Sequence, residues 1–117
     1  MRAVLTFIVL STPLTALADA PVVEGVDLRR DGETWTISVT VSHPDTGWDH
    51  YADGWVVLAP DGSELGYRTL HHPHVEEQPF TRSLSGVTIP DDVTQVVVHA
   101  DDSVHGRGPG VTVDLPR

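Results

Sequence analysis

The sequence predicts an all-β protein in which about seven antiparallel strands form two packed sheets. Three observations lead to this prediction: short strand-like runs of apolar and β-branched residues recur along the chain, turn-forming residues separate them, and no helical periodicity follows the N-terminal region. This combination is typical of immunoglobulin-like and fibronectin-like β-sandwiches. The chain lacks the cysteine pair that joins the sheets of antibody domains, so the expected likeness is one of architecture.

The first expected strand, residues 22–28, leads into the turn residues Arg30-Asp31-Gly32-Glu33, where glycine supplies a positive φ. The second, residues 34–42, is the clearest. Its apolar residues alternate with threonine and serine, as a half-buried antiparallel strand requires. These apolar residues are Trp35, Ile37, Val39 and Val41.

The later strands follow the same logic of apolar runs bounded by turns. We expect them at 54–59, 64–71, 79–87, 93–100 and 110–115. Turn residues lie at Pro60-Asp61-Gly62-Ser63 and at Pro90-Asp91-Asp92, and the last run places Val111, Val113 and Leu115 on one face.

The chain begins with the composition of a secretory signal peptide: an early arginine, an apolar run at residues 3–10 and small residues up to Ala20. We expect cleavage after Ala18, which assigns 1–18 to the signal and 19–117 to a single β-sandwich domain; cleavage after Ala20 is the alternative. No later apolar run is long enough to span a bilayer. The sequence therefore predicts a periplasmic or secreted protein with no transmembrane segment after signal removal.

Composition restricts the partners that the protein would bind. The sequence has 17 acidic residues against seven arginines, and its formal net charge is −10 at pH 7. This charge argues against nucleic acid and anionic lipid as partners. Cysteine is absent and Met1 is the only methionine, so the mature chain would offer no sulfur ligand to a Cu(I) ion.

All seven histidines lie in or beside three of the six connections, at 43–53, 71–79 and 100–109. If every connection reverses the chain direction, these three lie at the same end of the sandwich. Imidazole is the commonest metal-binding side chain and titrates near neutral pH. The sequence therefore predicts a metal site or a pH-sensitive surface at that end.

A zinc or copper(II) site needs about three or four nitrogen and oxygen ligands, usually supplied by separate segments. In one of the three connections, Pro73 interrupts the strand and lets His72 and His74 point the same way. His99 has the parity of an outer-face residue and is ranked below His105. We predict a Zn²⁺ or Cu²⁺ site with the candidate ligands His43, His50, His72, His74, His105, Asp49 and Asp102.

A calcium site is the alternative ion site at the same end. Asp45, Asp49 and Asp53 lie four residues apart, and Asp101 and Asp102 lie in another of the three connections. Ca²⁺ takes six to eight oxygen ligands, but this spacing does not match the EF-hand loop. We therefore rank Ca²⁺ below Zn²⁺ and Cu²⁺.

Aromatic residues in the same region support an alternative function without a metal. Trp48 and Tyr51 lie among charged residues of the connection 43–53, and His71 precedes the second histidine group. Together they would form the surface of an interaction module that recognises an envelope protein or a carbohydrate. No nucleophile elbow or comparable catalytic signature is present, so the sequence favours a binding protein over an enzyme.

Four segments of the chain together form a pattern that other proteins share. They are residues 47–53, 72–74, 77–84 and 102–106. In these segments the chain resembles a group of small exported bacterial proteins of uncharacterised function, and the resemblance covers most of the mature chain. It implies export and assigns no activity, fold or ligand.

Overall fold

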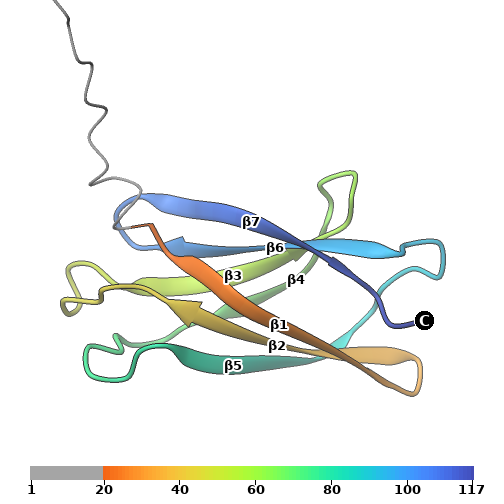
Figure 1. Cartoon of the computed structure of the whole chain (residues 1–117), viewed down its shortest axis with the longest axis horizontal. Helices are drawn as coiled ribbons and strands as arrows, with labels where there is room; N and C mark the ends of the chain where they lie inside the picture. The colour runs from red at the N-terminus through yellow and green to blue at the C-terminus, as the bar shows by residue number, and fades with distance from the viewer. Residues whose placement is uncertain (1–19) are drawn as a thin grey trace, which may run out of the picture.

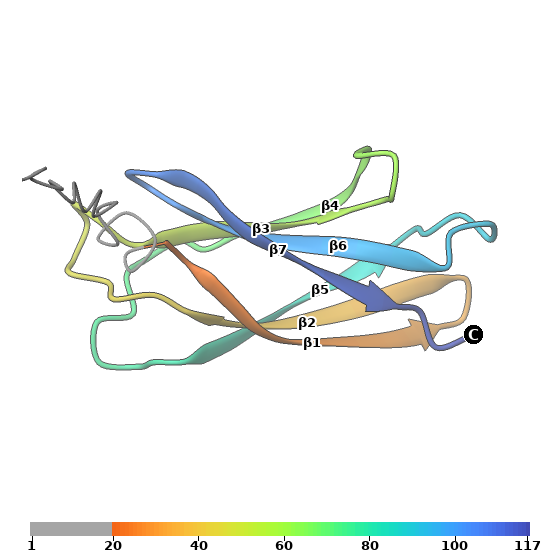
Figure 2. The ribbon, with the colours of Figure 1, turned by 45° about the horizontal axis from the view of Figure 1, so that its top comes forward.

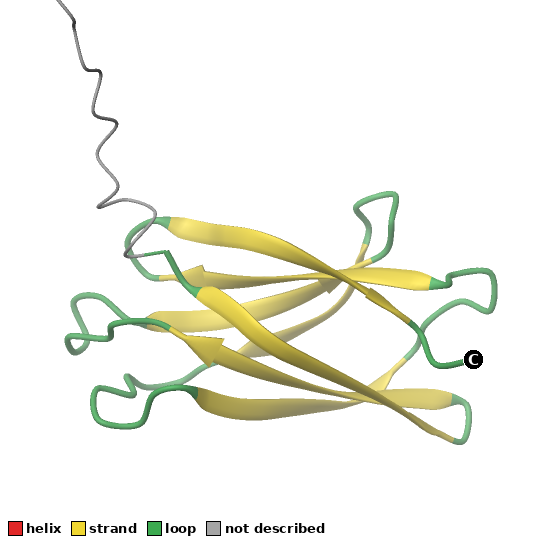
Figure 3. Cartoon of the chain, viewed as in Figure 1, coloured by secondary structure: helices red, strands yellow, loops and turns green. Residues whose placement is uncertain are grey.

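The computed structural model of the protein describes residues 20–117 (Figure 1). These residues form seven strands in two antiparallel sheets and contain no helix (Figure 3), so the all-β prediction is confirmed. In the same range no helix has the length and apolar character needed to cross a membrane. The expected signal peptide, residues 1–18, lies outside the described residues.

The two sheets contain three and four strands. The three-stranded sheet has the order β1-β2-β5 and the four-stranded sheet the order β4-β3-β6-β7. The strands are β1 (Val22–Asp31), β2 (Thr34–Ser42), β3 (Ala52–Leu58), β4 (Glu64–Thr69), β5 (Phe80–Val87), β6 (Gln95–Asp102) and β7 (Gly106–Asp114).

The core lies between the two sheets, which pack face to face (Figure 2). The alternating apolar residues predicted for the second strand all point into it, and Trp35 at their head is 1% exposed. Trp55 of β3 meets them from the other sheet with alternating valines of β6. With no disulfide in residues 20–117, this burial of apolar surface is the main force that joins the sheets.

The chain reverses direction at every connection, as predicted. The connections 43–51, 70–79 and 103–105 therefore lie at one end of the sandwich, on the left in Figure 1, where β1 also begins. We call this the histidine end. The opposite end holds the three turns without histidine, and Gly32 and Gly62 adopt the positive φ expected there, at 64° and 90°.

The predicted length of the last connection was wrong. Residues 100–109 were expected to be a loop, but β6 continues to Asp102 and β7 starts at Gly106, which leaves a short turn at 103–105. The glycine-rich start of β7 lacks an apolar pattern because it is an edge strand that pairs through its backbone, where glycine and Pro109 are tolerated. As a consequence, Asp102 stands on a rigid strand end.

Candidate functional site

His43 is the innermost residue of the histidine end. It follows β2 and continues the inward alternation of that strand, and its side chain is completely buried. Its Nδ1 lies 2.5 Å from Oδ1 of Asp45. A carboxylate oxygen accepts hydrogen bonds, so Nδ1 donates, and in the neutral imidazole Nε2 then carries an unshared lone pair.

Asp45 fixes the orientation of the His43 ring through Nδ1. Besides His43, its carboxylate accepts the backbone N–H of Ala52 at 3.0 Å and the backbone N–H of His74 at 2.7 Å. The Asp45 carboxylate is buried and joins the start of β3 to the connection between β4 and β5. Such a carboxylate on the far nitrogen of a histidine is the usual support of a metal-binding imidazole.

Asp102 faces His43 from the end of β6, and its side chain is also completely buried. One oxygen, Oδ1, accepts the backbone N–H groups of Val104, at 2.8 Å, and of His105. Burial by itself would raise the pKa of Asp102, but these hydrogen bonds outweigh it and the pKa is lowered. Asp102 is therefore a carboxylate at neutral pH, with its second oxygen directed at the histidines.

Three imidazoles surround Oδ2 of Asp102. His43 Nε2 and His50 Nε2 each lie 3.4 Å from this oxygen, and His105 Nδ1 lies 3.2 Å from it. The ring of His50 is in edge contact with both other rings, at centroid distances of 4.7 Å and 5.0 Å. The sequence-predicted residues His43, His50, His105 and Asp102 are thus brought together.

Three of these residues form what we call the His-His-Asp cluster: His43, His50 and Asp102. One ligand atom from each lies within 4.8 Å of the others, and they are the one group of three or more such residues within the described part of the chain. Nε2 of His43 and Nε2 of His50 are buried without a hydrogen-bond partner in residues 20–117. Two imidazole nitrogens and one carboxylate oxygen are a donor set for zinc, copper or iron(II).

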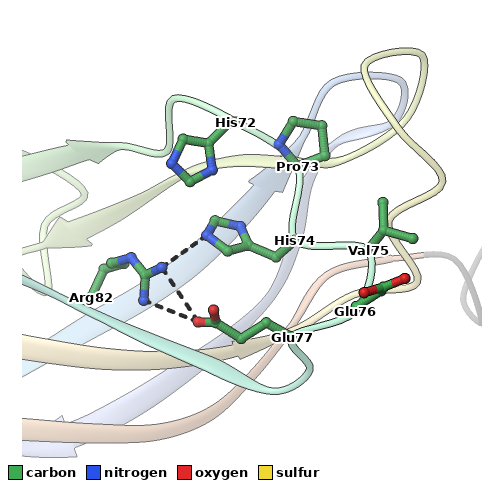
Figure 4. Close-up of a pocket in the computed structure, with 7 residues that line it drawn as sticks. All are labelled: His72, Pro73, His74, Val75, Glu76, Glu77 and Arg82. Atoms are coloured by element: carbon green, nitrogen blue, oxygen red, sulfur yellow. Dashed lines mark hydrogen bonds and ion pairs between the residues drawn. The ribbon is translucent and has the colours of Figure 1, made fainter.

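His72 and His74 lie apart from this cluster, beside a surface pocket (Figure 4). Their rings are 4.9 Å apart, but Nε2 of His74 accepts a hydrogen bond from Arg82 at 3.0 Å. The His74 ring also stacks on Phe80 at a centroid distance of 4.0 Å. The pair of histidines predicted on either side of Pro73 is therefore linked to the cluster indirectly, through the backbone N–H of His74 on Asp45 and through Gln78, which donates to the carbonyl oxygen of His74 and accepts the backbone N–H of His43.

The environment of His74 predicts a pH dependence of stability. Burial, with the charge of Arg82, lowers the pKa of His74 below its unfolded value of about 6.5. The unfolded chain then binds more protons, so stability falls as pH drops below about 6.5. In metal-free protein, urea unfolding measures the free energy of unfolding at pH 7.5 and at pH 5.5. His74→Phe, which keeps the stacking on Phe80, should lose less of this free energy between the two pH values than the unaltered protein does. Equal losses would contradict this assignment.

Asp49, the remaining predicted ligand, lies at the histidine end outside the cluster. The same is true of the predicted surface residues Trp48, Tyr51 and His71. Asp49 is exposed and does not belong to the group of converging donor atoms found within residues 20–117. Trp48 is 68% exposed and packs edge-on against Tyr51 at 5.7 Å, while His71 is exposed. His99 faces outward, as its parity predicted, and contacts the carbonyl oxygen of Gly108 at 2.9 Å.

The aspartates of the calcium alternative do not converge. Asp45 is turned inward onto backbone N–H groups, and Asp101 contacts Tyr67 and Arg107 at 3.2 Å and 3.3 Å. No group of three carboxylates occurs within residues 20–117. Sequence reasoning weighed Asp45 only as a calcium ligand, although its position two residues after an inward-facing histidine is a usable signal for a supporting carboxylate.

The sequence of this chain has a relative among known proteins. No protein-family model matches it. A protein of Halomicrobium mukohataei named "Putative lipoprotein" is 41% identical over 92 residues, which are 79% of this chain and 45% of the relative. The chain thus spans about half the length of this relative, whose name states no activity.

Two solved structures have a similar fold. A hypothetical protein of Pyrococcus horikoshii OT3 matches with a TM-score of 0.54 over 82% of this chain and 87% of its own. A superoxide reductase in the oxidised state matches with a TM-score of 0.51 over 83% of this chain and 87% of its own. Both are 16% identical to this chain, so they show a shared fold alone.

Proposed function

We propose that this is an envelope protein that binds a divalent transition metal ion, Zn²⁺ or Cu²⁺, at His43, His50 and Asp102. The observation that carries the proposal is the buried Nε2 of His43. Because Asp45 fixes the proton on Nδ1, the lone pair of Nε2 points at the carboxylate of Asp102 from 3.4 Å. A lone pair and a carboxylate oxygen repel each other in a buried site unless a metal ion or a proton lies between them, and the converging Nε2 of His50 favours the metal ion.

The separation of the donor atoms suits a metal ion. With bonds of about 2.0–2.1 Å in a tetrahedral arrangement, the donors of a zinc site lie about 3.4 Å apart. The two Nε2 atoms each lie 3.4 Å from Oδ2 of Asp102. Imidazole and carboxylate ligands without sulfur favour Zn²⁺ or Cu²⁺ over Cu(I).

The proposal also covers the location of the protein and the extent of its domain. The signal-like residues 1–18 and the relative's name both support an envelope location. We assign residues 19–117 to one domain, since the seven strands between residues 22 and 114 share one core.

The arrangement of the strands supports the immunoglobulin-like or fibronectin-like class. Seven antiparallel strands divide three and four, and completely buried Trp55 lies on the third strand, where antibody domains also carry a buried tryptophan. The fourth strand differs from the constant-type immunoglobulin order, because β4 pairs with β3 instead of joining the sheet of β1 and β2.

A metal titration tests the proposal. Metal-free protein titrated with Zn²⁺ and with Cu²⁺ in a calorimeter at pH 7.5 should show one saturable site. Because the ion binds the folded state, free metal at about 100 times Kd should stabilise the protein by about 2.7 kcal/mol. His43→Ala and Asp102→Asn should abolish both effects, whereas His71→Ala, exposed in a neighbouring connection, should leave them unchanged.

The interaction module remains the second candidate because the histidine end has exposed apolar side chains. Trp48, Val75 and Val104, one on each connection, are 68%, 55% and 57% exposed. Exposed apolar groups of this kind at one end of a domain favour contact with a protein or carbohydrate. If neither ion produces heat or a thermal shift, the metal proposal is rejected in favour of this module.

A further inference from the structure

The His-His-Asp cluster offers an ion only three protein donors. His43 and His50 each direct one Nε2 toward the site, and Asp102 has one oxygen available because its Oδ1 already accepts two backbone N–H groups. Asp102 therefore binds through Oδ2 alone. Structural zinc sites have four protein ligands, whereas sites with three hold water or another small ligand in the fourth position.

His105 is close to the cluster, but it supports Asp102 instead of acting as a ligand. Its Nδ1 faces Oδ2 of Asp102 at 3.2 Å, and it does not belong to the group whose donor atoms converge. The two nitrogens of an imidazole point in diverging directions, so Nε2 of His105 is directed away from that oxygen. The remaining carboxylate nearby, Asp45, is occupied on the far side of His43.

Burial shows from which side a small ligand can reach the ion. The side chains of His43 and Asp102 are 0% exposed, which closes the inner side of the cluster. His50 is 19% exposed and His105 40% exposed. Access from solvent therefore runs past these two rings at the histidine end.

We propose that the fourth coordination position of the bound metal ion is filled from solvent, by a water molecule or a small monoanion that approaches from the side of the partly exposed rings of His50 and His105. This inference rests on the proposed metal site. His105 acts as a positioning residue: it holds Asp102 through Nδ1 and borders this side of the site. Asp102 is the one charged ligand among the three, and the negative charge of Asp45 lies on the far side of the His43 ring, so the ion can accept a monoanion at its fourth position.

Azide binding to the Co²⁺-loaded protein tests this inference. The visible absorption bands of Co²⁺ respond to a change of ligand, so azide added in chloride-free buffer at pH 7.5 should change the spectrum saturably, with Kd in the millimolar range. His105→Ala should retain metal binding within about 100-fold, the usual cost of losing a supporting contact, and should still bind azide. His71→Ala is the matched control and should match the unaltered protein in both measurements.

The outcomes separate the two proposals. If Co²⁺ binds with one-to-one stoichiometry and azide leaves the spectrum unchanged, the open position is refuted and the metal site stands. If azide binds only to His105→Ala, and this variant loses much more than 100-fold in metal affinity, His105 is the fourth ligand and the inference is wrong. If the unaltered protein binds no Co²⁺, Zn²⁺ or Cu²⁺, both proposals fail.

Discussion

Asp45→Ala should lower the free energy of unfolding by about 3–5 kcal/mol, even without metal. The Asp45 carboxylate accepts hydrogen bonds from Ala52, His74 and His43, and the residue is 6% exposed. Alanine would leave three buried N–H donors without their acceptor. Each such donor costs about 1–3 kcal/mol, partly offset where water enters. Urea unfolding of metal-free protein measures the loss.

Two further variants make this prediction falsifiable. Asp49→Ala removes an exposed carboxylate from the same connection and should change stability by no more than about 0.5 kcal/mol. Asp45→Asn keeps the shape and one acceptor oxygen, so it should fall between alanine and the unaltered protein. If Asp45→Ala is no more destabilising than Asp49→Ala, the carboxylate does not organise the histidine end.

Trp35→Ala should be as costly, at about 3–5 kcal/mol, for a different reason. Trp35 is 1% exposed in the core, and the guanidinium groups of Arg30 and Arg117 lie 5.7 Å and 5.6 Å from its ring centroid. Its removal loses apolar burial and leaves a cavity between the sheets. Because a domain of this size is stable by about 5–15 kcal/mol, the variant should unfold at much lower urea concentration.

The same substitution at another tryptophan supplies the control. Trp48 is 68% exposed at the histidine end, so Trp48→Ala should change stability by about 0.5 kcal/mol or less. Similar losses for the two variants would show that Trp48 is packed more tightly than its exposure indicates. A small loss for Trp35→Ala would contradict the position of the core.

Local pattern was sufficient to predict the strands and the end at which the histidines gather. The alternation through residues 34–42 placed Trp35 in the core and directed His43 inward, because side chains of a strand alternate between its faces. It failed at residues 100–109, where glycine and proline have no apolar alternation but the backbone still pairs at a sheet edge.

The sequence by itself determined the all-β class, the common end of the three histidine-bearing connections and the absence of cysteine from these residues. Only the tertiary structure decided which histidines meet: it joins His43, His50 and His105 around Asp102, and it turns His74 toward Arg82. The physical reason is that strand periodicity specifies the face of each residue, whereas the distance between connections depends on sheet packing and on buried hydrogen bonds such as those of Asp45.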